Sequence, residues 1–319
     1  MKNNPRLLGV VMDPIESIVP KKDSTLAMML AAQRRGWQIV YLRQQDLYIS
    51  RGIASCTGRM LSVTDDLQSW YAYGEEWTGQ LDALDTILMR KDPPFDMEYI
   101  YTTYILQRAE DAGAMVVNRP QALRDINEKA FTAWFPELAP PTLLSRSHAA
   151  LRAFLDEHGS AVFKPLDGMG GKSIFVVHKG DLNTNVIIET LSDVGRRFVI
   201  AQRYIPEISA GDKRILLVNG EPIPYALARV PAPGESRGNL VMGATGEGRT
   251  LTDADARICA AVGPVLRERG VLFAGIDVIG DYLTEVNVTS PTGIRELDRQ
   301  FDLDIGNELI AAIEQQLEN

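Results

Sequence analysis

The chain has 319 residues, of which 45% are hydrophobic and 24% are charged, and its formal net charge at pH 7 is -9. This is the composition of an ordinary globular protein, with enough apolar residues for two or three domains that each bury a core. A net negative charge argues against nucleic acid as the main partner. No stretch approaches the roughly 20 apolar residues of a membrane-spanning helix, so we expect no membrane partner either.

Cysteines and histidines indicate neither a disulfide framework nor a zinc site. Cys56 and Cys259 stand outside any CxxC pair, and His148, His158 and His178 lack the spacing of metal ligands. The N-terminal residues run directly into an apolar segment and lack the apolar core of a cleavable signal. We therefore expect a protein of the reducing cytoplasm.

Residues 1–123 are predicted to form one doubly wound α/β domain. Its strands are expected in four apolar runs: residues 6–12, 37–42, 86–90 and 115–118. Its helices are expected in two capped segments: residues 25–35 and 96–112. In the less regular stretch that follows residue 44, residues 65–73 are predicted to be helical, with turns at Arg51-Gly52 and Thr57-Gly58. Support for a dinucleotide site is weak, because no GxGxxG motif follows the first strand.

Charged residues follow the predicted strand at 86–90. Arg90, Lys91 and Asp92 stand directly before Pro93-Pro94. Open α/β sheets hold their ligands at the C-terminal ends of strands, so these side chains are candidates for a ligand site. The alternative, that the charges only solvate a turn, is equally compatible with the sequence.

A glycine-rich loop dominates the next part of the chain. A helical segment is expected at residues 121–135 and a capped helix at 147–158, before strands at 161–165 and 174–177. The loop Gly168–Gly171 between those strands can fold over phosphates with its backbone N–H groups, and Lys164 can add a positive charge. It is not a P-loop, which needs a helix after the glycines. The alternative is a plain flexible hairpin tip.

Two arginines lie in a predicted β-hairpin further along. After a helix at 184–194 and a strand at 198–205, Asn219-Gly220 predicts a tight turn between strands at 215–218 and 223–230. Arg214 and Arg229 sit on these strands, and an arginine in an apolar strand needs an anionic partner. The glycine-containing segment 231–250 is predicted to be a lid, with Arg237 and Asn239 as its donors. The alternative is an unstructured surface loop.

A second hairpin carries the candidate metal ligands. Residues 273–279 and 282–288 are predicted strands around the turn at Gly280-Asp281. Because residues i and i+2 share a face of a strand, Glu285 and Asn287 point the same way, and Asp277 on the partner strand can reach the same patch. Such an all-oxygen set suits Mg²⁺, although a solvated polar sheet face is the competing interpretation. Helices are expected before and after this hairpin, at 252–269 and from about 304.

Together these segments resemble the ATP-grasp superfamily and, within it, the bacterial glutathione synthetases. Lysine, a glycine-rich hairpin and a Glu-x-Asn pair occur in many ATP-grasp ligases, whereas RKDPP and DGMGG are more particular to glutathione synthetases. The segments that carry the resemblance run nearly end to end: VMDP (11–14), MRKDPP (89–94), NEK (127–129), KPLDGMGG (164–171), GDKR (211–214), SRGN (236–239) and TEVNVTSP (284–291).

The resemblance implies an ATP-grasp fold of α/β and α+β type in three parts. These are an N-terminal doubly wound α/β domain (1–123), a small central α+β domain with the phosphate loop (124–205) and a C-terminal α+β domain (206–319) that carries the lid 230–250 and the metal site. ATP would bind between the last two. The resemblance also suggests a homotetramer.

The resemblance further implies roles for individual residues. The nucleotide would be bound by Lys129, Lys164, Gly168, Met169, Gly170, Gly171, Gln202, Arg203, Tyr204, Ile205 and Asp212. Mg²⁺, with Mn²⁺ as an alternative, would be held by Asp277, Glu285 and Asn287. The peptide and its activated carboxylate would face Arg214, Arg229, Arg237 and Asn239, and the acceptor amine would lie beside Ser290, Pro291, Thr292 and Gly293. Lys172, after the glycines, departs from the pattern, because a small residue is expected there.

The activity implied is ligation of glycine to γ-glutamylcysteine through an acyl phosphate, with ATP as co-substrate and glutathione, ADP and phosphate as products. Two alternatives stay open at this point. One is another ATP-grasp carboxylate–amine ligase, and the other is a non-catalytic ATP-binding protein of the same fold. An intact set of lysines and metal ligands argues against the second.

Overall fold

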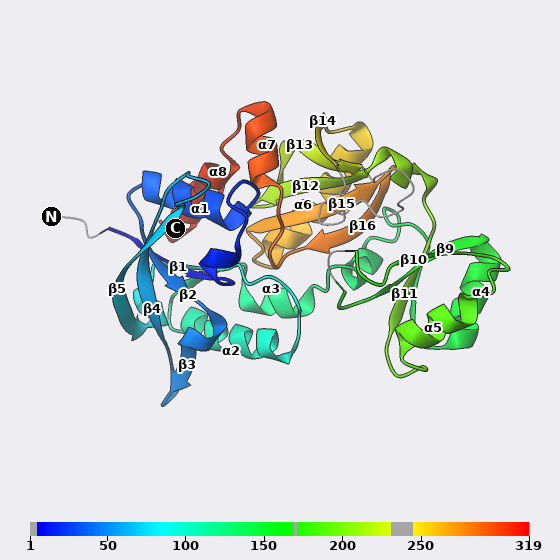
Figure 1. The fold of residues 1–319 in the computed structure, drawn as a ribbon, viewed down its shortest axis with the longest axis horizontal. Helices are drawn as coiled ribbons and strands as arrows, with labels where there is room; N and C mark the ends of the chain where they lie inside the picture. The colour runs from blue at the N-terminus through cyan, green and yellow to red at the C-terminus, as the bar shows by residue number, and fades with distance from the viewer. Residues whose placement is uncertain (1–4, 169–170, 231–244, 319) are drawn as a thin grey trace.

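The computed structural model of the chain describes residues 5–168, 171–230 and 245–318. Its strands form a seven-stranded, a four-stranded and a five-stranded sheet, which follow one another along the sequence. In Figure 1 the seven-stranded sheet lies at the left, the five-stranded sheet in the middle and the four-stranded sheet at the right. Short 3-10 turns connect several elements: η1 (Ile15–Ser17), η2 (Gln44–Asp46), η3 (Leu81–Ala83), η4 (Ala130–Trp134) and η5 (Pro206–Ala210).

The seven-stranded sheet has a parallel half that was predicted from its apolar runs. Its parallel strands are β1 (Leu7–Val11), β2 (Gln38–Leu42), β6 (Thr86–Met89) and β7 (Met115–Val117). Its helices are α1 (Ser24–Arg34) and α2 (Met97–Asp111), which Asp23 and Asp96 cap as N-cap side chains. Successive residues of β1 pack on opposite sides: Val10 joins the core that contains α1, and Val11 joins the core that contains α2. Burial on both faces explains why the strands are continuously apolar.

The predicted helix at 65–73 is wrong. This part of the chain forms an antiparallel extension of the sheet: β3 (Leu47–Ser50), β4 (Ile53–Val63) and β5 (Tyr71–Gln80). Asp66 accepts the N–H groups of Gln68 and Ser69, so a side-chain-supported turn occupies the start of the predicted helix. The turn at Arg51-Gly52 is confirmed, since both residues have positive φ.

The predicted turn at Thr57-Gly58 is also wrong, because both residues lie inside β4. Gly58 has a different purpose there. A Cβ atom at Gly58 would lie 2.5 Å from the backbone oxygen of Tyr41, so glycine permits close approach of the neighbouring strand.

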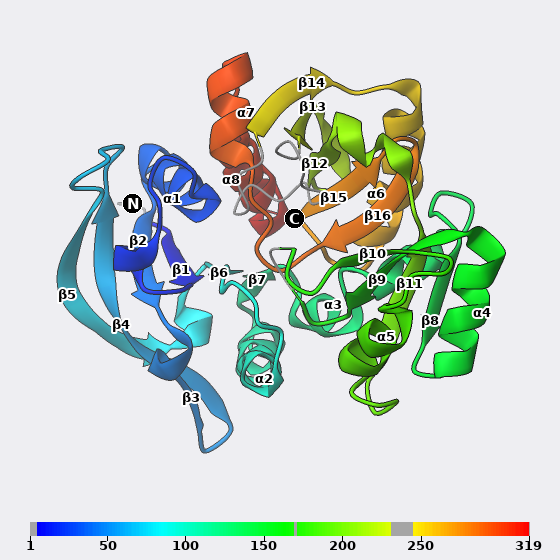
Figure 2. The same ribbon diagram turned by 45° about the vertical axis from the view of Figure 1, so that its right-hand side comes forward.

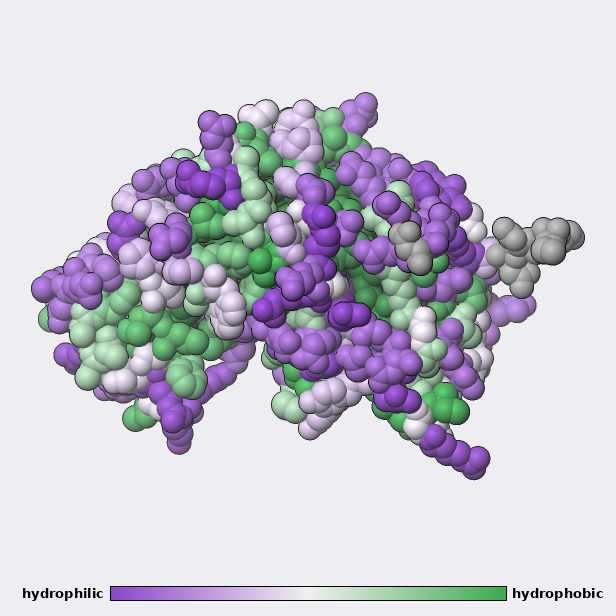
Figure 3. Space-filling view, turned by 180° about the vertical axis from the view of Figure 1, so that it is seen from behind, coloured by the Kyte–Doolittle hydropathy of each residue, from purple (hydrophilic) through white to green (hydrophobic). Residues whose placement is uncertain are grey.

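The four-stranded sheet is antiparallel. Its strands, in order, are β10 (Phe175–His178), β9 (Ser160–Pro165), β11 (Val199–Arg203) and β8 (Thr142–Ser145). Its helices α4 (His148–His158) and α5 (Thr184–Ser192) bury an apolar core against one face, in which Phe163 and Leu151 are fully buried. The other face is left for the pocket described below. Seen from behind, this unit forms the left-hand lobe, where hydrophobic residues gather on the surface beside a notch (Figure 3).

The predicted helical segment at 121–135 is interrupted. It consists of α3 (Pro120–Asp125) and the turn η4, with Asn127 between them. The side-chain oxygen of Asn127 accepts the N–H groups of Lys129 and Ala130, which ends the helix locally. This break directs residues 127–129 toward the pocket.

The five-stranded sheet is antiparallel and carries the predicted hairpins. Its strands, in order, are β14 (Thr245–Thr250), β13 (Glu221–Val230), β12 (Asp212–Val218), β15 (Phe273–Ile279) and β16 (Tyr282–Asn287). Its helices are α6 (Asp253–Glu268), α7 (Ile294–Phe301) and α8 (Ile305–Leu317). Two differences from the predictions stand out. Strand β14 occupies the end of the predicted lid, whose residues 231–244 lie outside the described part, and α7 was not predicted.

The two ends of the chain meet across the molecule. Helix α8 packs on α1, and a Cβ atom at Gly306 would lie 2.8 Å from the backbone oxygen of Ala27. Figure 2 shows the red C-terminal helices beside the blue N-terminal ones. The Asn118 side chain adds a second junction, because it donates to the backbone oxygens of Phe273 and Val288, each over 2.7 Å. In the described ranges, no helix combines the length and apolar character that a bilayer crossing requires.

Candidate active site

A cavity of about 340 Å³ lies between the four-stranded and the five-stranded sheets. Almost every residue predicted to act at a site lines it: Lys129, Lys164, Gly168, Gly171, Gln202, Arg203, Tyr204, Ile205, Asp212, Arg214, Arg229, Asp277, Glu285, Asn287, Ser290, Pro291 and Thr292. Gly293 lies just beyond, as the N-cap of α7. Four further predicted residues lie outside the described part of the chain: Met169, Gly170, Arg237 and Asn239.

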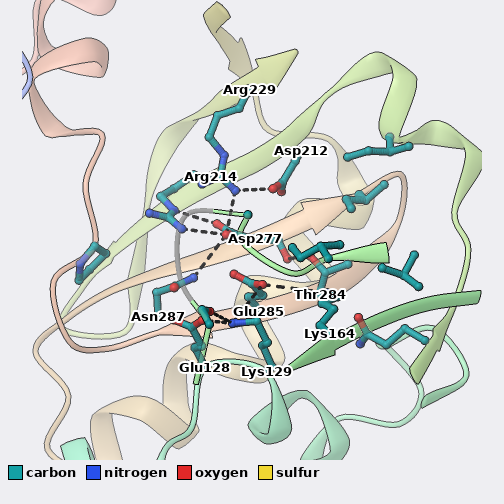
Figure 4. A pocket seen from close by; sticks show the side chains of 18 of the residues that line it. Glu128, Lys129, Lys164, Asp212, Arg214, Arg229, Asp277, Thr284, Glu285 and Asn287 are labelled. Atoms are coloured by element: carbon teal, nitrogen blue, oxygen red, sulfur yellow. Dashed lines mark hydrogen bonds and ion pairs between the residues drawn. The ribbon is translucent and has the colours of Figure 1, made fainter. Parts of the chain in front are cut away.

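The hairpin β15–β16 brings three oxygen-bearing side chains to one face of its sheet. Asp277 lies directly opposite Glu285 in the antiparallel register, and Asn287 follows two residues later on the same strand. The amide nitrogen of Asn287 donates to Asp277 Oδ2 over 3.4 Å. The structure therefore brings together the three side chains that the sequence placed on a common face (Figure 4).

Two arginines hold Asp277 tightly. Arg214 on β12 donates from Nε and Nη2 to the two carboxylate oxygens of Asp277, each over 2.8 Å. Arg229 on β13 lies 2.8 Å from Asp277 Oδ2 and also bonds Asp212. Burial opposes ionisation of Asp277, but the two arginines outweigh it and hold the pKa of this carboxyl well below its usual range. We call Arg214, Arg229, Asp212 and Asp277 the arginine cluster.

Asp212 differs from Asp277 although both contact Arg229. Burial is the largest influence on Asp212 and raises its pKa to about 6, despite the nearby guanidinium. Its Oδ1 atom is buried without a hydrogen-bond partner among the described residues. An orphaned buried oxygen is costly, so this atom is a candidate to receive a ligand donor or a cation.

Two lysines approach the hairpin from the other side of the cavity. Lys129 bonds Glu128 and donates to the backbone oxygen of Gly168 over 2.6 Å. Its Nζ lies 3.9 Å from Glu285, and the Nζ of Lys164 lies 4.0 Å from the same carboxylate. Burial lowers the pKa of Lys164, whereas for Lys129 the carboxylates Glu285 and Glu128 outweigh burial and raise the pKa. We call Lys129, Lys164, Glu128 and Glu285 the lysine cluster.

An apolar slot extends from the lysine cluster between the two sheets. Its walls are provided by Val162, Ile174, Val176, Ile205, Ile208 and Ile279. Arg203 borders the slot and donates to the Tyr282 hydroxyl over 2.9 Å, with its guanidinium 5.2 Å from the same ring. Gln202 is buried there and donates to the Thr142 hydroxyl. An apolar slot that ends in cations suits a nucleobase joined to phosphates.

The opposite end of the cavity is lined by Asp92, Pro93 and the segment 289–292. Asp92 is held by a bond from its backbone N–H to Asp13, which also pairs with Lys91. The charged group after the predicted strand at 86–90 therefore reaches the cavity through Asp92, whereas Arg90 and Lys91 point elsewhere.

Some lining residues were not predicted individually. Glu128 stands in the NEK segment, but its carboxylate was not assigned a role; its backbone oxygen accepts the Val286 N–H and so fixes it beside the hairpin. Thr284 and Thr289 also line the cavity. Lys172 is exposed. Within the described ranges, no group of three or more His, Cys, Asp or Glu side chains could hold a metal ion, so the candidate set depends on the Asn287 amide.

Two family models match the chain: the prokaryotic glutathione synthetase N-terminal domain over residues 7–124 and the prokaryotic glutathione synthetase ATP-grasp domain over residues 128–302. The glutathione synthetase of Vibrio vulnificus (strain YJ016) is 56% identical over 311 residues, which cover 98% of either chain. That of Pseudomonas aeruginosa (strain PAO1) is 57% identical over 310 residues, which cover 97% of this chain and 98% of the relative.

Solved structures share the fold at low identity. D-cycloserine synthetase DcsG superimposes with a TM-score of 0.69 at 14% identity and covers 98% of this chain and 99% of its own. The ATP-grasp ligase PsnB, complexed with minimal precursor, Mg and ADP, gives a TM-score of 0.63 at 16% identity and covers 99% and 100%. These likenesses show an ATP-grasp fold.

Proposed function

Because the chain belongs to the prokaryotic glutathione synthetase family, we infer that it is an ATP-dependent carboxylate–amine ligase that forms glutathione. It joins glycine to γ-glutamylcysteine and releases ADP and phosphate. The observation that carries the assignment to this cavity is the convergence of the lysine cluster, the arginine cluster and Asn287 on one space (Figure 4).

A free carboxylate is unreactive toward an amine, so the reaction needs an activated acid. The C-terminal carboxylate of the dipeptide attacks the γ-phosphorus of ATP and gives an acyl phosphate and ADP. The glycine amine then attacks the acyl carbon, and phosphate leaves as the amide bond forms. Catalysis of this kind depends on positioning and charge neutralisation more than on acid–base groups.

We assign the phosphates to the lysine cluster and the acyl group to the arginine cluster. Lys129 and Lys164 lie at the phosphate end of the apolar slot, where their partners are carboxylates that a triphosphate can replace. Arg214 and Arg229 are fixed by Asp277 and lie across the cavity, where they can stabilise the oxyanion of the tetrahedral intermediate. Gln202, Tyr204 and Ile205 would lie along the adenine.

The donor set of the hairpin fits Mg²⁺, with Mn²⁺ as the alternative. Asp277 and Glu285 supply carboxylate oxygens. The amide nitrogen of Asn287 donates to Asp277, so its amide oxygen is left to bind an ion. The unpartnered Oδ1 of Asp212 adds negative potential nearby. When bound, such an ion would neutralise charge on the phosphates.

The location, oligomeric state, partners and domain division of the enzyme are proposed from its family. We place the enzyme in the cytoplasm as a homotetramer with small-molecule substrates only. We also propose the division into parts at residues 1–123, 124–205 and 206–319, with the acceptor amine beside residues 290–293.

The test is a ligation assay with purified protein, ATP, Mg²⁺, γ-glutamylcysteine and glycine. We expect glutathione to form with one equivalent of phosphate, and phosphate release to depend on glycine. A panel of other acids and amines tests for a different ligase. Tight nucleotide binding without turnover on any pair would instead identify a non-catalytic ATP-binding protein and reject the proposal.

A further inference from the structure

The segment 289–293 forms one wall of the cavity and is held from outside it. Thr289, Ser290, Pro291 and Thr292 line the cavity, and the segment joins β16 to α7. None of the nucleotide-side groups contacts it through a hydrogen bond among the described residues. Its anchors come from the N-terminal sheet unit, which lies more than 190 residues earlier in the chain.

Arg90 is the first anchor. It follows β6, is 5% exposed, and donates from Nε to the Thr25 hydroxyl and from Nη2 to the Pro291 backbone oxygen, each over 3.0 Å. Its guanidinium also lies 5.8 Å from the centre of the Phe273 ring. In the part of the chain that the structure describes, no carboxylate lies within 4.0 Å of it.

A buried guanidinium without a close carboxylate is costly. Burial lowers the pKa of Arg90, with only partial compensation from Asp92 and Asp23. An apolar side chain of the same volume would serve stability at least as well. What an apolar side chain cannot do is bridge two oxygens on two different elements, which the planar fork of arginine does.

Ser24 is the second anchor. It is the first residue of α1 and is 1% exposed. Its hydroxyl oxygen accepts the N–H of Gly293 over 3.2 Å and that of Ile294 over 3.3 Å. Gly293 has no side chain with which to cap α7, so the cap of this helix comes from another part of the chain.

We propose that Arg90 and Ser24 are positioning residues for ligation: they fix the 289–293 segment and thereby set the affinity of the cavity for its amino-acid substrates, with no part in nucleotide binding. The proposal rests on the ligase function above. Both residues act through a wall of the cavity, since neither lines it. The nucleotide end depends on side chains from the other two sheets, and among the described residues neither anchor forms a hydrogen bond with any of these side chains.

The experiment compares full-length Arg90→Met, Arg90→Lys and Ser24→Ala with wild type. KM values for glycine, γ-glutamylcysteine and ATP are measured separately, and ADP binding is measured by calorimetry. For Arg90→Met we expect kcat/KM for glycine or for γ-glutamylcysteine to fall on the order of 10- to 100-fold, because the wall that positions the substrate is displaced. We expect a smaller loss for Ser24→Ala and no change in the dissociation constant of ADP.

A matched control is available in Arg124. It too bonds neutral oxygens, at the Thr103 hydroxyl and backbone, and it lies over the Tyr104 ring, away from the cavity. Arg124→Met should leave all three KM values unchanged. Lysine at position 90 keeps the charge but not the fork, so Arg90→Lys should resemble Arg90→Met.

Three results would overturn the proposal. The first is unchanged KM values for both glycine and γ-glutamylcysteine, the second is a loss of ADP affinity as large as the loss in kcat/KM, and the third is wild-type kcat/KM in Arg90→Lys. If Arg90→Met does not fold, the same readouts on Ser24→Ala and Arg90→Lys decide the matter. The Ser24→Ala/Arg90→Met double variant adds a further test. Because both residues hold the same segment, the losses in kcat/KM of the two single variants should not be additive. Failure of the proposed function itself is distinguishable, since wild type would then show no glycine-dependent phosphate release.

Discussion

The two charged clusters in the cavity are built differently. In the arginine cluster, Asp277 is bound by Arg214 and Arg229 at 2.8 Å, and the side chains have fixed partners in the free protein. In the lysine cluster, Glu285 stands 3.9 Å from one lysine and 4.0 Å from the other. The arginine side of the cavity is locked. On the lysine side the contacts of Glu285 and Lys164 are loose, and among the described residues only Lys129 is bonded closely, to Glu128 and to the Gly168 backbone oxygen.

This difference matches the two tasks of a ligase. A group that stabilises an oxyanion must be in place before the reaction, which favours rigid bidentate pairs. A group that receives a triphosphate must give up its resident partner, which favours long, weak contacts such as those of Glu285 with the two lysines. Charged side chains therefore contribute to stability in the arginine cluster and to ligand binding in the lysine cluster.

The largest expected effect concerns the two hairpin carboxylates. Asp277→Asn leaves the buried Arg214 without its counter-ion and Arg229 with Asp212 alone, so it should lower the free energy of unfolding by about 3–5 kcal/mol as well as abolish ligation. Glu285→Gln should also abolish ligation but lower stability by less than about 1 kcal/mol, because its contacts are long. Urea unfolding followed by the phosphate-release assay measures both. Equal destabilisation by the two variants would remove the distinction between a locked and a loose side.

The next effect compares Lys164, which lines the cavity, with Lys213, which does not. Lys164→Met should weaken nucleotide binding about 100-fold or more without loss of stability, since the charge is buried and its ion pair among the described residues, with Glu285, is 4.0 Å long. Lys213 is the matched control: it pairs with Asp255, which is fully buried at the start of α6. Lys213→Met should lower the unfolding free energy by about 3–5 kcal/mol and spare nucleotide binding. Calorimetry with ADP and thermal unfolding separate the two results, and a reversed pattern would contradict the comparison.

A pH series tests the two aspartates that share Arg229. The pKa of Asp212 rises from 3.8 to about 6 on folding, so the folded protein binds a proton that the unfolded chain has lost. Between about pH 4 and 6 this group therefore makes stability fall as pH rises, by about 3 kcal/mol in total. Asp277 has the opposite sign, and its contribution is lost only as pH falls below the unfolded value of 3.8.

Asp212→Asn should remove the first slope. The difference in unfolding free energy between the variant and wild type should grow with pH across that window and stay level above it. Asp298, whose pKa burial also raises to about 6, is present in both proteins and cancels in the difference. A pH-independent difference would show that Asp212 is ionised throughout.

Features of this cavity that depend on residues close together in the sequence were predictable, and features that depend on residues far apart in the sequence were not. The hairpin at β15–β16 was predictable, because Gly280-Asp281 separates two alternating runs and the period of two places Glu285 and Asn287 on one face. The pairing of Arg214 with Asp277 was not, since these residues are 63 positions apart and only the sheet register brings them together.

The errors in secondary structure have the same origin. Helix α7 was missed because its cap is Ser24, 269 residues before Gly293, and no local signal marks its start. The helix expected at 121–135 was too long because the Asn127 side chain competes locally for the backbone. Gly58 was taken for a turn, whereas its lack of a side chain permits contact with Tyr41 on the adjacent strand.

The smallest effect concerns Glu128, whose carboxylate forms an ion pair with Lys129 in the free protein. Burial, followed by the proximity of Glu285, raises the pKa of Glu128, so two carboxylates compete for the same lysines. Glu128→Gln should remove one competitor and one repulsion, and ADP without divalent cation should bind about two- to fivefold more tightly, a difference of about 1 kcal/mol or less. Asp167→Asn is the control, because Asp167 also lies beside the glycine loop but pairs with the exposed Arg197. Weaker ADP binding in Glu128→Gln would mean that Glu128 orients Lys129 for the phosphates, and the lysine cluster would then be as preorganised as the arginine cluster.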